Sequence, residues 1–191
     1  MLELALHILD IAENSVRAGA KTVFIDINES RKNDRLSIEI RDDGSGMDEA
    51  TVKRAMDPFY TSKKVRRVGL GLPMLAEAAE RAGGLFAIES REGVGTRVAV
   101  EFRLSHIDRQ PLGDVTGSIL ALIAGNAGVD FVYRHDCDGS LFTLDTREIR
   151  SEIGDIPINH VEVLKFVRQH LVEGLNEIGT EARSSHHFEG G

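Results

Sequence analysis

Five polar side chains interrupt the apolar run at the start of the chain, at steps of four, three, four and three residues: Glu3, His7, Asp10, Asn14 and Arg17. That spacing places them in one stripe along a single face of a helix. A solvated polar face is the ordinary explanation of such a stripe. Asparagine and aspartate are poor residues for a helix interior, however, because their short side chains compete for backbone hydrogen bonds. An acid, an amide and a cation in line on a largely apolar helix therefore indicate contact with something specific.

The elements that position this helix follow from apolar periodicity and turn residues. Gly19 ends the helix, and alternating apolar residues predict a strand–turn–strand unit. A short helix from Asp48 must end near Pro58, and a loop without apolar period precedes a second full helix. A second antiparallel pair completes this part. The predicted segments are the strands 21–27 and 36–40, the loop 60–69, the helix 71–84 and the strands 85–90 and 96–104.

The polar stretch 105–114 is predicted to be a boundary between a domain of residues 1–104 and a small acidic α/β region of residues 105–180. That region should contain an apolar helix over 117–128, a hairpin through 135–140 and a long helix near 160–178. We expect the two helices to form a small separate core, and the region to dock a partner rather than bind a ligand. Residues 181–191 have little to bury and are predicted to be a disordered tail.

Composition limits the classes of function. The 191 residues are 41% apolar, which is enough for a real core, and the net charge is −8. Residues 105–191 hold 7 basic and 14 acidic residues, an acidic balance that argues against nucleic acid as a partner. The absence of a long apolar run argues against a membrane span. A single cysteine, Cys137, excludes an internal disulfide and is typical of the cytoplasm, where we expect the protein to act.

Five short segments, in order, together resemble the GHKL superfamily, the ATP-binding domain shared by histidine kinases, gyrase and mismatch-repair ATPases. The resemblance covers roughly residues 2–104 and implies the Bergerat ATP-binding fold. In that α/β two-layer sandwich, helices pack on a mixed, largely antiparallel sheet. Each segment alone is a weak signal, because short glycine patterns recur by chance; the ordered set is a strong one. The segments are "DIAENSVRAGA", "DDGSG", "DPFYTSK", "GLGL" and "EGVGT".

The resemblance implies that the helical stripe is the magnesium and phosphate wall of a nucleotide site. Asn14 offers a neutral oxygen to Mg²⁺, which accepts few protein oxygens beside phosphates and waters. Arg17, one turn further on, would meet the phosphate charge. Asp42 would accept the exocyclic amine of adenine, and Gly44 and Gly46 would let the base approach the backbone closely.

The resemblance also implies a second set of ATP contacts. Lys63 occupies the family's lysine position in the lid and is expected to bind phosphate. Gly69, Leu70 and Gly71 precede a helix, so free N–H groups and the helix dipole would face the anion. Thr96 completes the expected pocket.

The motifs define the ligand better than the reaction. Hydrolytic relatives carry a water-activating glutamate four residues before the magnesium asparagine, where this chain has Asp10, one methylene shorter. The first hypothesis is a stand-alone kinase or ATPase that transfers the γ-phosphoryl of ATP to a partner protein or to water in a regulatory role. The second is a non-catalytic, ATP-dependent switch that docks a partner. The acceptor is not identified by the sequence, and an oligomer is compatible with it.

Overall fold

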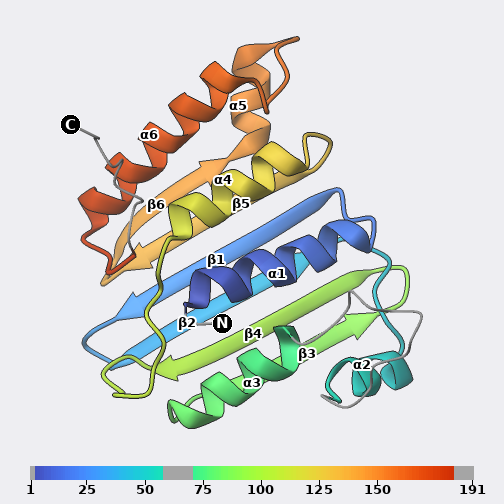
Figure 1. The fold of residues 1–191 in the computed structure, drawn as a ribbon, viewed down its shortest axis with the longest axis vertical. Coiled ribbons are helices and arrows are strands. Elements are labelled where there is room, and N and C mark those ends of the chain that lie inside the picture. Colours follow the sequence, from blue (N-terminus) through green and yellow to red (C-terminus); the bar gives the residue numbers. More distant parts are fainter. Residues whose placement is uncertain (1–2, 58–70, 183–191) are drawn as a thin grey trace, which may run out of the picture.

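The computed structural model describes residues 3–57 and 71–182, which form one six-stranded sheet with helices packed against it (Figure 1). The strands are β1 (Thr22–Ser30), β2 (Arg35–Asp42), β3 (Leu85–Arg91), β4 (Gly95–Arg103), β5 (Asp130–Cys137) and β6 (Ser140–Asp145). The helices are α1 (Leu4–Arg17), α2 (Glu49–Ala55), α3 (Gly71–Arg81), α4 (Val115–Gly125), α5 (Thr146–Ile153) and α6 (Val161–Ile178). Residues 181 and 182 are described, and the remainder of the predicted tail, 183–191, lies outside the described residues.

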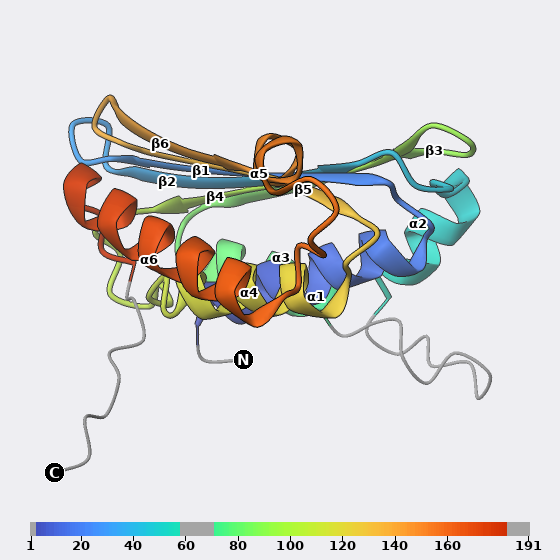
Figure 2. The ribbon, with the colours of Figure 1, turned by 90° about the horizontal axis from the view of Figure 1, so that it is seen from above.

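The strand order is β3-β4-β2-β1-β5-β6, and only the β1–β5 pair is parallel. The expected mixed, largely antiparallel sheet is therefore confirmed. Seen from above, α1, α3, α4 and α6 form one layer beneath the strands (Figure 2). The two-layer arrangement places one face of the sheet against helices.

Alternation along the central strands explains the two faces of the sheet. Alternate residues along most of β1, β2 and β4 are apolar and buried beneath the helices. These residues are Val23, Ile25, Ile27, Leu36, Ile38, Ile40, Val98, Val100 and Phe102. Several of the intervening residues carry charge and pair across the strands, as Arg97 does with Glu39 at 2.6 Å and Arg41 with Asp26 at 3.3 Å. One face of the sheet is thus core and the other is polar.

Residues beyond 105 extend this sheet instead of forming a core of their own. β5 pairs with β1 from Thr22 to Glu29, and β6 continues the sheet beyond β5. The apolar faces of α4 and α6 are buried, as expected, but they belong to the same apolar cluster as α1 and β1. The helices α4 and α6 do pack on each other, as expected. The expectation of a separate core is wrong, because β5 pairs with β1 and the two parts share one sheet and one core.

The segment 105–114 holds the start of α1. Glu3 precedes the helix without capping it through its side chain. The N–H groups of Leu4 and Ala5 instead donate to the carbonyl oxygens of Pro111 and Leu112, at 3.0 and 2.8 Å. A helix begins with four N–H groups that lack partners within the helix, and this segment supplies acceptors for two of them.

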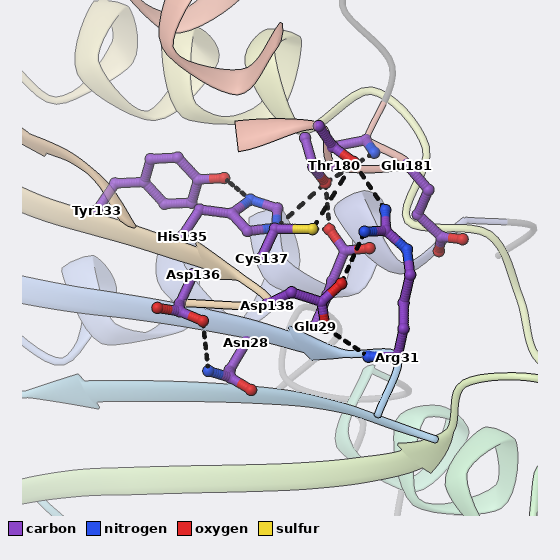
Figure 3. Close-up of polar contacts among 12 residues, drawn as sticks. Asn28, Glu29, Arg31, Tyr133, His135, Asp136, Cys137, Asp138, Thr180 and Glu181 are labelled. Carbon is purple, nitrogen blue, oxygen red and sulfur yellow. Dashed lines mark hydrogen bonds and ion pairs between the residues drawn. The ribbon is translucent and has the colours of Figure 1, made fainter. Parts of the chain in front are cut away.

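A buried polar cluster joins the ends of β1, β5 and α6 (Figure 3). The Tyr133 hydroxyl lies 2.6 Å from His135 Nδ1, and His135 Nε2 lies 2.8 Å from Glu29 Oε1. Thr180, just after α6, donates its hydroxyl to the same carboxylate. Burial opposes ionisation of Glu29, but the hydrogen bonds from His135 and Thr180 outweigh it, so the pKa of Glu29 is lowered. We call Tyr133, His135, Glu29 and Thr180 the Glu29 cluster.

Candidate nucleotide site

A cavity of about 310 Å³ lies beside α1, and we call it the α1 cavity. It is bounded by α1, the ends of β2 and β4, the loop after β2, α2 and the start of α3. Small-molecule sites typically have this character, a mostly apolar hollow with a few placed polar groups. The cavity is lined by Ile11, Asn14, Ser15, Arg17, Ala18, Ile40, Asp42, Ser45, Gly46, Met47, Thr51, Ala55, Leu72, Thr96 and Val98.

Asp42 ends β2 and presents its carboxylate at the cavity wall. Its Oδ1 accepts hydrogen bonds from the N–H groups of Gly44 at 2.9 Å and Thr96 at 3.3 Å. Its Oδ2 accepts the Ser15 hydroxyl at 2.6 Å. The carboxylate is therefore fixed from three directions, by α1, by β4 and by its own turn.

The glycines of "DDGSG" make room for the chain itself. Gly46 has φ +64°, and a Cβ on it would lie 1.9 Å from the Arg91 carbonyl oxygen of the β3–β4 hairpin. A Cβ on Gly44 would lie 3.0 Å from Asp42 Oδ1. The backbone of Gly46 is therefore approached closely by the β3–β4 hairpin, whereas the sequence had suggested a close approach by a bound base. Asp43 closes the turn, where its carboxylate accepts the N–H of Lys21 at 2.7 Å.

Ser90 connects the loop after β2 to Thr96. The Ser90 hydroxyl accepts the N–H of Met47 at 2.8 Å and lies 2.8 Å from the Thr96 hydroxyl. Met47 and Thr96 both line the α1 cavity. Ser90 therefore fixes two parts of the wall without lining it, and nothing in its strand pattern indicated that role.

Asn14 and Arg17 both line the cavity and bond to each other. Arg17 Nη1 donates to Asn14 Oδ1 at 2.7 Å, and Arg17 Nη2 donates to Glu13 Oε2 at 2.7 Å. Asn14 Oδ1 is the oxygen that sequence assigned to Mg²⁺. Its acceptor character fits a hard cation, provided that Arg17 turns toward phosphate oxygens when a nucleotide binds. Within residues 3–57 and 71–182, no cluster of three His, Cys, Asp or Glu groups could hold a metal by itself.

Asp10 lies one turn before Asn14, against the first residue of α3. A Cβ on Gly71 would lie 1.9 Å from Asp10 Oδ2, so a larger residue at position 71 would make this carboxylate move. Burial raises the pKa of Asp10, an effect that the nearby Arg17 charge reduces. The carboxylate is thus a stronger base than an exposed aspartate.

The polar stripe divides into two halves. Glu3 accepts the N–H of Asp114 at 3.2 Å, and His7 lies 3.1 Å from Gln110 Oε1. These two residues hold the segment 105–114, and burial lowers the pKa of His7. The other half of the stripe lies at or beside the α1 cavity.

Of the expected site residues, Asn14, Arg17, Asp42, Gly46 and Thr96 line one cavity. Gly44 bonds to Asp42, and Asp10 packs against Gly71 next to that cavity. Lys63, Gly69 and Leu70 lie outside the described residues.

Sequence reasoning missed Ser15 and the apolar walls. Ser15 directly follows Asn14, and its only signal was a polar type at a buried helix position. Ile11, Ile40, Met47 and Val98 have the spacing of ordinary core residues, so pattern alone does not separate them from the core.

Comparison with known proteins identifies a protein family that matches the first half of the chain. Residues 2–106 match the family described as histidine kinase-, DNA gyrase B-, and HSP90-like ATPases. The chain is 31% identical over 104 residues to the sensor histidine kinase YxdK of Bacillus subtilis, and covers 32% of that protein with 52% of its own length. It is 34% identical over 90 residues to sporulation kinase E of the same organism, where 46% of this chain covers 12% of the relative. The chain therefore spans a third or less of these relatives.

Two solved structures share the fold. The N-terminal domain of a DNA repair protein has a TM-score of 0.56 at 15% identity, over 92% of this chain and 59% of that one. The Aquifex aeolicus MutL ATPase domain complexed with ADP has a TM-score of 0.53 at 16% identity, over 88% of both chains. Both likenesses extend past residue 106 and include part of the region after 105. None of the described helices is long and apolar enough to cross a membrane.

Proposed function

The chain belongs to the family of histidine kinase-, DNA gyrase B- and HSP90-like ATPases, and we propose that it binds Mg-ATP in the α1 cavity. The observation that carries the proposal is the fixed carboxylate of Asp42 at the wall of an apolar cavity. Ile11, Ile40, Met47 and Val98 offer apolar surface to a planar base. Asp42 would accept its exocyclic amine.

The phosphates would extend toward the half of the stripe that lies at the cavity. Arg17 would exchange its bonds to Asn14 and Glu13 for phosphate oxygens, which frees Asn14 Oδ1 to hold Mg²⁺. Mg²⁺, when bound there, would neutralise charge on the phosphates. Lys63, Gly69, Leu70 and Gly71 are proposed as further phosphate contacts, on the ground of the family resemblance.

We propose that the γ-phosphoryl is transferred to a partner protein or to water, in a regulatory role. Phosphoryl transfer depends mainly on positioning and charge neutralisation. Asp10 is the proposed base, because burial raises its pKa and the carboxylate lies one turn from Asn14. A raised pKa makes a better proton acceptor at neutral pH, as long as the group stays ionised.

A non-catalytic switch is the second candidate, and the Arg17 pairing favours it. Without nucleotide, Arg17 bridges Asn14 and Glu13 on the surface of α1. Nucleotide binding that breaks this bridge would change a protein surface even if no phosphate were released.

One experiment separates the candidates. The protein is incubated with γ-labelled ATP and Mg²⁺, alone and with cell extract, and label is followed to protein and to free phosphate. Transfer of label that the Asp42→Asn variant lacks supports a kinase or an ATPase. ATP binding without release or transfer of label supports the switch. Absence of ATP binding by the folded protein would overturn the proposal.

A further inference from the structure

Ser15 is buried in α1 yet bonds across to β2. It is 5% exposed, and its hydroxyl lies 2.6 Å from Asp42 Oδ2. The same hydroxyl lies 3.3 Å from the Ile11 carbonyl oxygen, the usual partner of a helical serine. A hydroxyl has one proton, and the short distance to a carboxylate marks the stronger of the two bonds. Ser15 also lines the α1 cavity.

The Asp42 carboxylate has few free positions left. An ionised carboxylate offers about four lone-pair sites. Gly44 N–H, Thr96 N–H and the Ser15 hydroxyl fill three of them. Two of these donors are backbone N–H groups, which only a proline would remove, and Ser15 is the only side chain among the three. Its hydroxyl holds Oδ2 and so helps to set the rotation of the carboxylate and the direction of the remaining acceptor site.

We propose that Ser15 is a positioning residue that makes the α1 cavity select adenine over guanine nucleotides. This inference rests on the proposed binding of ATP. Adenine carries an exocyclic amine, a donor, where guanine carries a carbonyl oxygen, an acceptor. A carboxylate held with one lone pair toward that position attracts the amine and repels the carbonyl. A carboxylate released on one side turns or takes up water, so the amine loses its aimed acceptor and the carbonyl meets less repulsion.

The test compares the affinities of the full chain for ATP and GTP, each with Mg²⁺, by calorimetric titration. Ser15→Ala should weaken ATP binding about tenfold and change GTP binding by no more than about twofold. The ATP/GTP affinity ratio should therefore fall about tenfold. A merely structural serine would weaken both nucleotides alike and leave the ratio unchanged, which would overturn the inference.

Two further variants show whether Ser15 acts through Asp42. Ser118 is a matched control, because it is also 5% exposed in a helix and bonds to a carbonyl, that of Ala5 at 3.0 Å. Ser118→Ala should keep the ratio of the parent. Adding Ser15→Ala to Asp42→Asn should change the ratio no further, because the two residues act as one unit. Additive effects of the two substitutions would contradict the proposal.

Folding and function failures remain distinguishable. If Ser15→Ala does not fold, Ser15→Cys replaces the hydroxyl with a slightly larger, weak donor and should lower the ratio in the same direction. A parent protein that binds ATP tightly but has an unchanged ratio in the folded variant refutes the role of Ser15 alone. A parent protein that binds neither nucleotide refutes the proposed function instead.

Discussion

Asp42 is the residue on which the nucleotide proposal depends most, because among the described residues that line the α1 cavity it alone carries a carboxylate. Asp42→Asn should weaken ATP binding about 10- to 100-fold, since the amide turns a donor toward groups that already donate. Thermal unfolding should show that the fold persists. Unchanged affinity in a folded variant, measured by calorimetry, would place the base elsewhere.

Asp10 should show opposite effects on turnover and on stability. Burial raises its pKa, so the folded state favours the protonated form and the ionised form costs stability at neutral pH. Asp10→Asn keeps the shape but removes the charge. It should abolish phosphate release, leave Mg-ATP affinity nearly unchanged and raise the melting temperature at neutral pH. The gain in melting temperature should disappear as the pH falls and Asp10 in the parent becomes protonated.

Two observations would contradict this role of Asp10. Equal phosphate release by variant and parent would exclude it as the base. An equal gain in melting temperature at every pH would show that packing, and not charge, explains the stability. Asp108, an exposed carboxylate outside the cavity, provides the control. Asp108→Asn should alter neither phosphate release nor melting temperature.

How much of the site the sequence predicts depends on the kind of signal that each residue carries. Asp42 and Asn14 lie in ordered motifs, and the structure brings both to one cavity. Ser15 and Ser90 each bond to a partner far along the chain, 27 and 43 positions away, and no local pattern encodes such contacts. Gly46 is a different case. The sequence indicated that another group comes close to its backbone, but not that this group is the β3–β4 hairpin.

The helices and strands were likewise predictable where a local pattern defines them, and not where long-range contacts do. Strands with strict alternation were predicted to within a few residues. The helix α5 was missed, because "TREIRSEI" has one buried residue and is too short for an apolar period. The parallel pairing of β1 with β5 was also missed, since it joins segments about a hundred residues apart through contacts that local periodicity does not contain.

At the scale of elements, the Glu29 cluster is predicted to hold the end of α6 on the sheet. Glu29→Gln can keep a neutral oxygen toward His135 and Thr180, which both bond to Oε1, but it removes the charge that strengthens these buried hydrogen bonds. It should cost about 2 kcal/mol of unfolding free energy. The pKa of Glu29 is lowered in the folded state, so its stabilising contribution is fully present at neutral pH. That contribution is lost as the pH falls below the ordinary glutamate pKa toward the lower folded value.

Denaturant unfolding across a pH series checks this expectation. The difference between parent and Glu29→Gln should be largest at neutral pH and should shrink toward acid. Glu101→Gln is the matched control, because Glu101 pairs with Arg35 at 3.3 Å on the exposed face of the sheet. Exposed pairs contribute little, so the control should change the free energy by less than about 1 kcal/mol. A pH-independent loss in Glu29→Gln would mean that its charge is not the cause.

At the scale of the whole molecule, the family match covers fewer residues than the unit that folds together. The match ends at residue 106, and no residue after Val98 lines the described α1 cavity. Yet β5 and α4 pack directly on β1 and α1. Residues after 105 therefore lie outside the described cavity wall but support two elements of the site. These are α1, which carries Asn14 and Ser15, and β1, which pairs with β2.

A fragment of residues 1–104 should consequently fail to fold cooperatively and should not bind ATP. Its β1 would become an open edge, and the face of α1 that packs on α4 would meet water. Thermal unfolding followed by circular dichroism checks the fold, and calorimetry checks ATP. A fragment of residues 1–182 keeps every contact described here and should melt like the full chain. If residues 1–104 gave a sharp melting transition and bound ATP as the full chain does, the first 104 residues would be an autonomous domain. The parallel β1–β5 pairing would then contribute little to the stability of the nucleotide site.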